Sequence, residues 1–168
     1  MLIRKEKPED IQGIRQINIK AFNTDAEADL VEALRESGVP LISLVAEEYG
    51  ELVGHILFSP VTLDNHNSPI SIAALAPMAV VPKYQNKGIG SRLVVEGFKC
   101  CQENGYTAVV VLGHPRFYSR FGFVPSVHCG IKSEYDVPAE VFMIKALEDT
   151  ALKGHSGIIK YHRAFSIL

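Results

Sequence analysis

The sequence predicts a mixed-sheet domain of the α/β or α+β class. Two observations lead to this prediction. Segments with the apolar patterns of strands are interspersed with segments of helical period. Their order is one strand, two helices, a β meander, and then strand–helix–strand–helix–strand, which is typical of helices packed on a sheet. Because 168 residues are the size of one domain and can bury a stable core, we expect a single domain over residues 1–168.

Composition narrows the classes of function. The net charge is -2, from 17 basic and 19 acidic side chains, and 47% of the residues are hydrophobic. This balance argues against disorder and against a basic surface for nucleic acid. No apolar run has the length of a membrane span or of a signal peptide, so we expect a cytoplasmic protein with no membrane partner.

The chain has three cysteines, which are Cys100, Cys101 and Cys129. A low, odd number in a chain of this length does not predict a disulfide framework, and their spacing is not that of metal ligands. We therefore expect buried or half-buried thiols and no metal.

The N-terminal third predicts a strand and two helices. A short strand at Ile3–Lys5 precedes a helix that starts at Pro8, because proline and acidic residues suit a first helical turn. The segment Thr24–Glu27 fits a capping box for the second helix, and Gly38 is its expected left-handed end. The apolar face of the first helix is expected to comprise Ile11, Ile14, Ile17 and Ala21.

Three strands are predicted next. Leu41–Glu48 and Glu51–Ser59 have strand patterns and are joined at Tyr49-Gly50, a typical hairpin turn. The third, Ile70–Val81, is expected to be broken at Pro77, because proline cannot donate to a strand ladder.

The remaining elements alternate between helix and strand. A long helix is predicted over Ile89–Glu103, with Gly105 as its stop. The continuous apolar run Thr107–Leu112 indicates a strand covered on both faces. A short helix at Pro115–Phe121 follows, and the later strands are Val141–Leu147 and Ile158–Tyr161.

The loop Gln85–Ser91 lies between a predicted strand and the long helix. The first N–H groups of a helix have no intrahelical partner, and its dipole favours negative charge, so this position can bind an anion. Gly88 and Gly90 let the backbone approach a ligand closely, and Lys83 and Lys87 add positive charge.

The loop pattern alone leaves several interpretations open. The dinucleotide-binding fingerprint requires a third small residue where Leu93 stands, and Gly90-Ser91-Arg92 does not match the end of a Walker loop. A tight strand-to-helix turn without a ligand is equally compatible with the two glycines.

The wider context resembles a known family. Gln85-x-x-Gly88-x-Gly90 is similar to the signature of the GNAT N-acetyltransferases, and Leu75–Val80 resembles the splayed strand before it. Phe117–Phe123 resembles the Y-x-x-x-G-F element of the family. Over Leu112–Pro125 the sequence is similar to one bacterial branch, the YhbS-like predicted acetyltransferases.

This resemblance implies a fold and an activity. The fold would be a mixed, mostly antiparallel twisted sheet of six to seven strands with a splayed central strand and about four helices, and its core motifs would span residues 75–125. The activity would be direct transfer of an acetyl group from acetyl-coenzyme A to a primary amine of a small molecule or peptide, in a ternary complex. A non-catalytic acyl-coenzyme A-binding or sensing module is the alternative, and an unrelated nucleotide-binding domain is a third. The oligomeric state would be monomer or homodimer.

The resemblance also implies which residues hold coenzyme A. Backbone amides from Lys87 to Ser91 would bind the pyrophosphate, while Gln85 would brace the loop. Backbone groups of Met78 and Val80 would pair with the pantetheine arm, and the Met78 amide would face the thioester carbonyl. The full expected set is Met78, Ala79, Val80, Gln85, Asn86, Lys87, Gly88, Ile89, Gly90, Ser91, Ser119 and Arg120.

Two residues are expected to be catalytic. Tyr118 matches the family's general acid, which protonates the departing thiolate. His114 is the first candidate for the base that takes a proton from the amine, and the other candidates are His55, Asp64 and His66.

Recognition of the acceptor is expected in variable segments, because loops carry most of the specificity in such folds. These segments are the first two helices and the loops Phe22–Asp25, Asp64–Pro69 and Val127–Tyr135. The acids that could attract a cationic amine are Glu27, Asp29 and Glu32.

Overall fold

The computed structural model describes residues 1–65 and 69–168, and it divides the chain into two compact units. Unit 1 consists of Met1–Ser59, Ala76–Cys100 and Arg163–Leu168, and unit 2 consists of Pro60–Leu75 and Cys101–His162. Strands β3 (Glu51–Asp64) and β4 (Ile72–Val80) and helix α3 (Ile89–Glu103) each contribute residues to both units.

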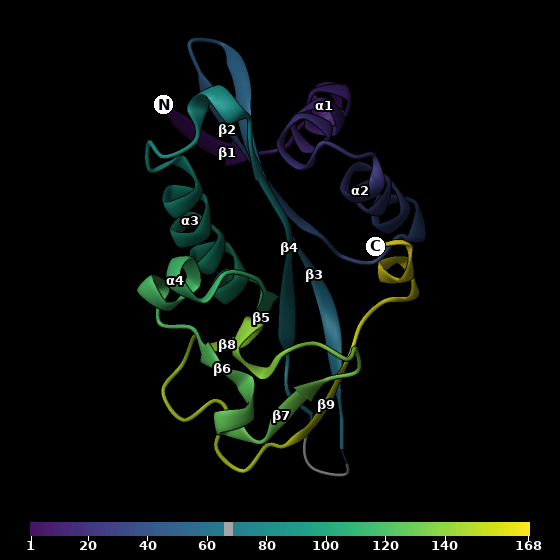
Figure 1. Ribbon diagram of the computed structural model, residues 1–168, viewed down its shortest axis with the longest axis vertical. Helices are drawn as coiled ribbons and strands as arrows, with labels where there is room; N and C mark the ends of the chain where they lie inside the picture. Colours follow the sequence, from purple (N-terminus) through teal and green to yellow (C-terminus); the bar gives the residue numbers. More distant parts are fainter. Residues whose placement is uncertain (66–68) are drawn as a thin grey trace. The chain divides into compact units, whose positions relative to one another are not determined.

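Unit 1 contains an antiparallel set of strands (Figure 1). Strand β1 (Leu2–Lys5) pairs with β2 (Ile42–Glu48), and β2 pairs with the first part of β3. The predicted hairpin turn is confirmed, since Tyr49 and Gly50 have φ values of 50° and 78°.

Helices α1 (Ile11–Phe22) and α2 (Ala26–Ser37) pack against each other in unit 1 (Figure 1). Ile14 and Ile17 are buried as predicted, but Ile11 is 36% exposed, because Pro8–Asp10 forms a 3-10 turn and the α-helix begins only after it. The C-terminal turn Arg163–Ile167 covers α2. Gly38, at φ 79°, ends α2 as predicted.

The predicted capping box before α2 is wrong. Asp25 occupies the N-cap position and makes no side-chain cap, and the Thr24 hydroxyl lies 3.4 Å from the Ala26 nitrogen. Glu27 does not reach back, and its Oε1 atom is buried without a hydrogen-bond partner among the described residues. The apolar period of α2 explains this orientation, because Glu27 precedes the buried Leu30 and Val31 by one turn.

Helix α3 follows the predicted loop in unit 1. Leu93 and Val94 are fully buried, as the sequence pattern predicts. Gly97 lies so close to the Phe58 ring of β3 that a Cβ atom there would meet Cζ at 2.5 Å. A glycine at this position therefore lets α3 approach β3 closely.

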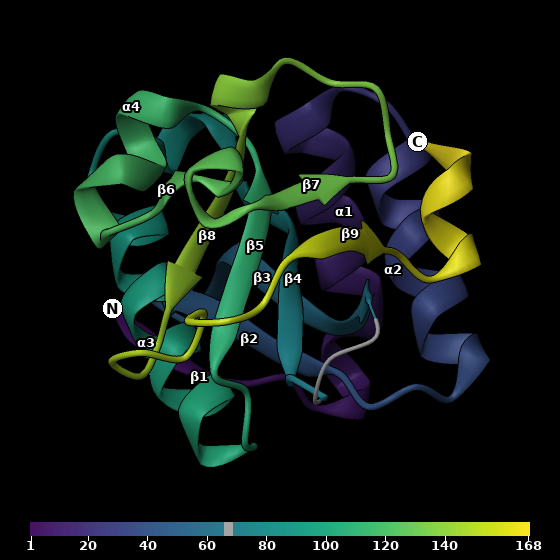
Figure 2. The same cartoon turned by 90° about the horizontal axis from the view of Figure 1, so that it is seen from below.

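Unit 2 is built around a second set of strands (Figure 2). The first half of β4 is parallel to β5 (Ala108–Leu112), and β5 is antiparallel to β8 (Phe142–Ala146). Three further pairs belong to it: β6 (Val124–Pro125) with β8, β7 (Ile131–Ser133) with β9 (Gly157–Lys160), and β9 with the end of β3. Strand β3 is also the neighbour of β4.

Two prolines mark changes of pairing in the strands. Strand β4 is continuous through Pro77, but its pairing with β5 covers only Ile72–Leu75, so the expected end of regular pairing near this proline is confirmed. Strand β3 does not end at Ser59. Its pairing with β2 reaches Phe58 and its pairing with β9 begins at Thr62, so Pro60 lies between these two pairings.

The described residues contain nine strands, more than the six to seven expected, because the short strands β6 and β7 have no recognisable sequence pattern. The four expected helices are present: α1, α2, α3 and the one-turn α4 (Pro115–Tyr118). No helix within the described residues is both long and apolar enough to cross a membrane. Whether residues 1–168 form a single domain stays a prediction.

Candidate functional site

The loop before α3 has the local conformation that its glycines and amides predict. Asn86 and Gly88 have positive φ values, 62° and 85°. The Gln85 side chain donates from Nε2 to the Val80 carbonyl oxygen at 2.9 Å, so it ties the loop to the end of β4. Arg92 N donates to the Gly88 oxygen at 3.1 Å, which closes the first turn of α3.

The loop is open above Gly88. A Cβ atom built on Gly88 would meet no heavy atom within 4 Å. The N–H groups of Lys87 and Gly88 donate to no acceptor among the described residues. Exposed donors at the start of a 15-residue helix form a site that suits an anion.

Two lysines lie close to this loop. The Nζ atoms of Lys83 and Lys87 are each 5.4 Å from the centroid of the Tyr84 ring. Lys83 and Tyr84 also line a pocket of about 370 Å³, together with Lys20 and Glu51. Unit 1 therefore places positive charge next to the open amides.

The end of β4 belongs to the same unit as the loop. Ala79 is 3% exposed, while Met78 and Val80 on the other face of the strand are half-buried. The alternation of a strand separates these faces. Met78, Val80 and the loop thus form one continuous segment of unit 1.

Tyr118 belongs to unit 2, at the end of α4. It is 8% exposed, and its ring packs edge-on against Phe117 and Phe123 at centroid distances of 4.9 and 5.5 Å. Its ring also lies over Gly113, where a Cβ atom would come within 2.5 Å of Cε2. Burial raises the pKa of Tyr118 to about 12, so the phenol stays protonated at neutral pH.

The neighbours of Tyr118 are more exposed. His114 accepts the N–H groups of Phe117 and Tyr118 at its carbonyl oxygen, and it lines a pocket of about 320 Å³ with Gly113. The Ser119 hydroxyl is 3.5 Å from the Arg116 carbonyl oxygen. The Arg120 guanidinium lies over the Phe117 ring at 4.8 Å.

The other candidate bases differ in position. His55 is fully buried, with Nε2 2.9 Å from the Ser43 hydroxyl and Nδ1 3.3 Å from the Asn18 amide, and burial together with the charge of Arg35 lowers its pKa to about 3. It is therefore a neutral core residue and not a base in contact with substrate. Asp64 is exposed at the end of β3, and His66 lies outside the described residues.

Two of the three candidate acids of α2 share one ion-pair partner, and the third has none in the described part of the chain. Asp29 and Glu32 both pair with Arg15, at 3.0 and 3.2 Å. Each of these two carboxylates forms an ion pair, which favours a structural role, but one arginine against two carboxylates leaves a net negative charge there. Glu27 makes no ion pair among the described residues, as its buried oxygen already indicated.

The cysteines follow the expectation from the sequence. All three lie within the described residues and are thiols that form no disulfide there. Cys101 is buried, and Cys100 and Cys129 are half-buried. The part of the chain that the structure describes contains no cluster of His, Cys, Asp or Glu that could hold a metal ion.

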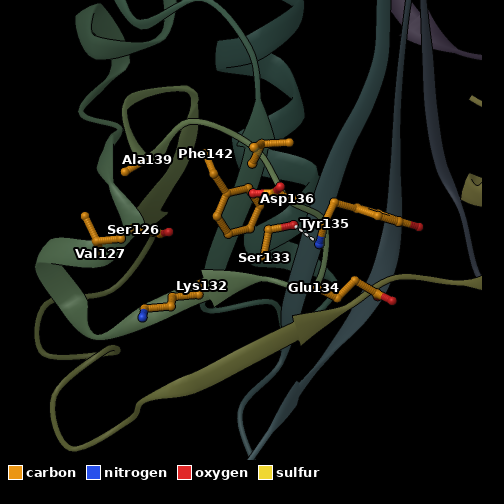
Figure 3. Close-up of a pocket in the computed structure, with 10 residues that line it drawn as sticks. Ser126, Val127, Lys132, Ser133, Glu134, Tyr135, Asp136, Ala139 and Phe142 are labelled. Atoms are coloured by element: carbon orange, nitrogen blue, oxygen red, sulfur yellow. Dashed lines mark hydrogen bonds between the residues drawn. The ribbon is translucent and has the colours of Figure 1, made fainter.

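One site in unit 2 is missed by sequence reasoning. A pocket of about 480 Å³ lies between the segment 126–139 and Phe142 of β8 (Figure 3). The sequence indicates that the loop Val127–Tyr135 takes part in recognition of the acceptor, but it predicts neither the pocket nor the contribution of Phe142. The short strand β7, which has no recognisable pattern, gives that loop its shape.

This chain combines a mixed sheet with an open glycine loop between a strand and a long helix. Proteins of the α/β class use such a helix start to bind anionic groups. A family model described as an acetyltransferase (GNAT) domain matches residues 2–125. The chain belongs to the GNAT acetyltransferase family, as the sequence motifs indicated.

Individual relatives agree with this assignment. The chain is 40% identical over 167 residues to the uncharacterized N-acetyltransferase YhbS of Escherichia coli K12, covering 99% of both chains. The crystal structure of E. coli YhbS in complex with CoA matches with a TM-score of 0.93 at 39% identity, over 98% of this chain and 91% of that one.

A second solved structure is also similar. It is a GNAT family acetyltransferase from Brucella melitensis in complex with acetyl-CoA, which matches with a TM-score of 0.80 at 34% identity, over 98% of this chain and 97% of that one. These similarities confirm the predicted fold class and the resemblance to the YhbS-like branch.

Proposed function

We propose that this N-acetyltransferase uses acetyl-coenzyme A and transfers the acetyl group directly to a primary amine of a small molecule or peptide. Two relatives of the same fold were crystallised with CoA or acetyl-CoA, which supports the choice of cosubstrate. In the proposed step, the amine nitrogen attacks the thioester carbonyl, a C–N bond forms and the C–S bond breaks. The amine loses one proton and the departing thiolate gains one.

The observation that carries the proposal is the open amide loop before α3. The pyrophosphate of coenzyme A would lie on the N–H groups from Lys87 to Ser91, close to the positive charge of Lys83. A single contact with a helix dipole is worth about 0.3–1 kcal/mol, so several donors must act together. The side chain of Gln85 would hold the loop in place through its hydrogen bond to Val80.

The end of β4 would bind the rest of the cofactor. Backbone groups of Met78, Ala79 and Val80 would pair with the amides of the pantetheine arm, in the manner of an added strand. The Met78 amide would donate to the oxyanion that develops on the thioester, an interaction worth roughly 3–4 kcal/mol when well placed.

Tyr118 is the proposed proton donor to the thiolate. The phenol is protonated at neutral pH, as a donor must be, and burial, which raises its pKa to about 12, makes it a weaker acid than an exposed tyrosine. His114 remains the first candidate base, supported by its exposure and its place on a pocket wall. Ser119 and Arg120 are proposed to contact coenzyme A, although Arg120 also stacks on Phe117.

A matched pair of glycine substitutions tests the loop. Gly88 and Gly105 have φ values of 85° and 84°, and at neither residue would an added Cβ atom have a heavy atom within 4 Å. Gly88→Val and Gly105→Val therefore carry the same kind of backbone strain. Coenzyme A at about 100 times its dissociation constant should stabilise the wild type by about 2.7 kcal/mol, or roughly 5–11 °C in Tm.

The expected result is that Gly105→Val keeps this shift and Gly88→Val loses it. A Gly88→Val variant with a full shift would show that the loop does not hold coenzyme A. A larger shift with ATP or NAD than with coenzyme A in the wild type would favour a nucleotide-binding protein instead.

Tyr118→Phe tests the catalytic role. The variant keeps the ring packing on Phe117 and Phe123, so its fold and its coenzyme A shift should persist. Loss of general acid catalysis should lower kcat by about 10²–10⁴-fold, measured as thiol release with an amine panel. An unchanged kcat would remove Tyr118 from the mechanism. Coenzyme A binding without thiol release on any amine would favour the non-catalytic module.

A further inference from the structure

The pocket missed by sequence reasoning has the dimensions of a small-molecule site. Its volume is about 480 Å³, within the roughly 300–1,000 Å³ of typical ligand pockets. It is formed wholly within unit 2, by the 3-10 turn after β6, strand β7, the segment up to Ala139 and the start of β8 (Figure 3).

Part of the wall is apolar and firmly held. Phe142 is 2% exposed and packs in the core of unit 2. The Tyr135 ring lies 5.3 Å from that of Tyr161. The Glu134 carboxylate accepts the Tyr161 N–H at 2.5 Å, which anchors this segment to the end of β9. The Phe142 ring is therefore held in the wall before any ligand arrives, and Tyr135, whose side chain points away from Phe142, fixes the segment against Tyr161 (Figure 3).

The charged side chains that line the pocket lie at separate places. The Asp136 carboxylate makes no hydrogen bond or ion pair among the described residues, and it lines the same space as Phe142 and Ser133 (Figure 3). Lys132 is the cation of the lining, and its amine is drawn well away from Asp136 (Figure 3). An unpaired carboxylate beside an aromatic wall is complementary to an organic ammonium ion.

The pocket is close in the fold to the segment that holds Tyr118. Phe142 is the partner of Leu112 in the β5–β8 ladder. The next residue, Gly113, donates its N–H to the Val141 oxygen at 2.9 Å and packs against the Tyr118 ring. The end of β5 and the start of β8 therefore position both Phe142 in the pocket wall and Tyr118, the proposed general acid.

We propose that this pocket binds the acceptor and that the acceptor is an organic ammonium ion with an aromatic or branched apolar body. Asp136 binds the ammonium group, and the Phe142 ring contacts the apolar body (Figure 3). That this ligand is the acceptor rests on the proposed acetyl transfer, whereas its binding to the pocket is tested without acetyl-coenzyme A.

The direct test is a titration of ¹⁵N-labelled protein with 2-phenylethylamine, in the absence of coenzyme A. Its neutral analogue 2-phenylethanol and its acidic analogue 3-phenylpropionate serve as controls of charge. The amine should shift the backbone resonances between Ser133 and Phe142. Its dissociation constant should be about ten-fold lower than that of either analogue, since a hydrogen bond to a charged group lowers a dissociation constant by at least about this factor.

Three variants separate the pocket from general charge effects. Asp136→Asn should weaken amine binding about ten-fold. Ala139→Trp, which fills the pocket with bulk and leaves its charge unchanged, should abolish it. Asp149→Asn removes the same charge from an exposed position of unit 2 outside the pocket and should leave amine affinity unchanged.

Tighter binding of 3-phenylpropionate, or amine affinity that is equal in Asp136→Asn and the wild type, would overturn the proposal. So would the absence of shifts in the pocket at millimolar amine. The coenzyme A thermal shift is measured on the same proteins. If that shift is missing in the wild type while the amine titration succeeds, the proposed transferase function fails and the pocket assignment stands.

Discussion

At the scale of single residues, His55 of unit 1 is a buried titratable group that takes no part in the proposed acetyl transfer. It is fully buried between Ser43 and Asn18, and its ring hydrogen bonds need the neutral imidazole. Since Asn18 donates from its amide to Nδ1, the Nε2–H group donates to the Ser43 hydroxyl. A protonated ring would lose the first of these bonds and would leave a buried charge.

The buried imidazole predicts a dependence of stability on pH. Burial lowers the pKa of His55 from 6.5 to about 3, so only the unfolded chain binds this proton between those values. The contribution of His55 is complete above about pH 6.5 and is lost as pH falls toward 3, at up to about 1.4 kcal/mol per pH unit. His55→Gln removes the titration and retains a donor and an acceptor.

Denaturant unfolding at a series of pH values from about 7 to about 4 measures this effect. The free energy of unfolding should fall more steeply for the wild type than for His55→Gln, because all other titrating groups are common to both. Parallel curves would mean that His55 is already protonated in the folded protein.

The contrast between histidines also marks a limit of sequence reasoning. His55 and His114 are both candidate bases by sequence, and the sequence does not rank them by accessibility. His55 lies in a central strand whose inner face is covered by α1, while His114 begins an exposed turn. Burial depends on which element packs over a residue, and a local pattern does not contain that information.

At the scale of elements, the contact between α3 and β3 depends on Gly97. Alanine is the better helix former by about 1 kcal/mol, so propensity alone predicts that Gly97→Ala is stabilising. The added Cβ would come within 2.5 Å of the Phe58 ring, and overpacking of this kind typically costs about 1–3 kcal/mol. We expect a net loss of stability in chemical denaturation.

A double-mutant cycle identifies the cause. In a Phe58→Leu background the ring is absent, and Gly97→Ala should cost less than it does in the wild type. If Gly97→Ala is as stable as the wild type, α3 moves away from β3 without penalty. An equal cost in both backgrounds would mean that the Phe58 ring is not what opposes the methyl group.

Elements with a long apolar period are the ones that sequence reasoning places well. The apolar residues of α3 recur with the helical period, and those of β5 form one continuous run. The predicted boundaries of both elements agree with the structure within a residue. The cap of α2 is predicted wrongly because the helix begins one residue later than the capping box requires: Asp25 stands at the N-cap and makes no side-chain cap. Strands β6 and β7, at two and three residues, are too short to show a period.

At the scale of the whole molecule, the loop and the pocket show how far the sequence leads. The loop Gln85–Ser91 is contiguous, so the sequence indicates a strand-to-helix turn that contains Gly88, while the left-handed conformation of Asn86 is not predicted and the ligand stays a proposal. The pocket of unit 2 is lined by Phe142 and by the preceding segment, residues 126–139. The position of Phe142 is set by its pairing with Leu112 of β5. Such a site becomes visible only when the strand register is known.

Direct transfer makes one prediction about the molecule as a whole, namely that no cysteine takes part. Cys101 is buried at 0% exposure, and Cys100 and Cys129 are half-buried, so none is arranged as an exposed nucleophile. The combined variant Cys100→Ser, Cys101→Ala, Cys129→Ser should retain kcat within about two-fold, because proximity of the two bound substrates supplies the catalysis. Its stability should fall by about 1 kcal/mol through the loss of buried sulfur.

Initial-velocity kinetics complete the test, because a ternary complex and an acyl-enzyme give different patterns. With acetyl-coenzyme A and an amine varied together, reciprocal plots should intersect for both the wild type and the cysteine variant. Parallel lines indicate a covalent intermediate. Acetyl-cysteine detected by mass spectrometry after mixing the wild type with acetyl-coenzyme A, together with loss of turnover in the variant, would replace direct attack by a two-step transfer through sulfur.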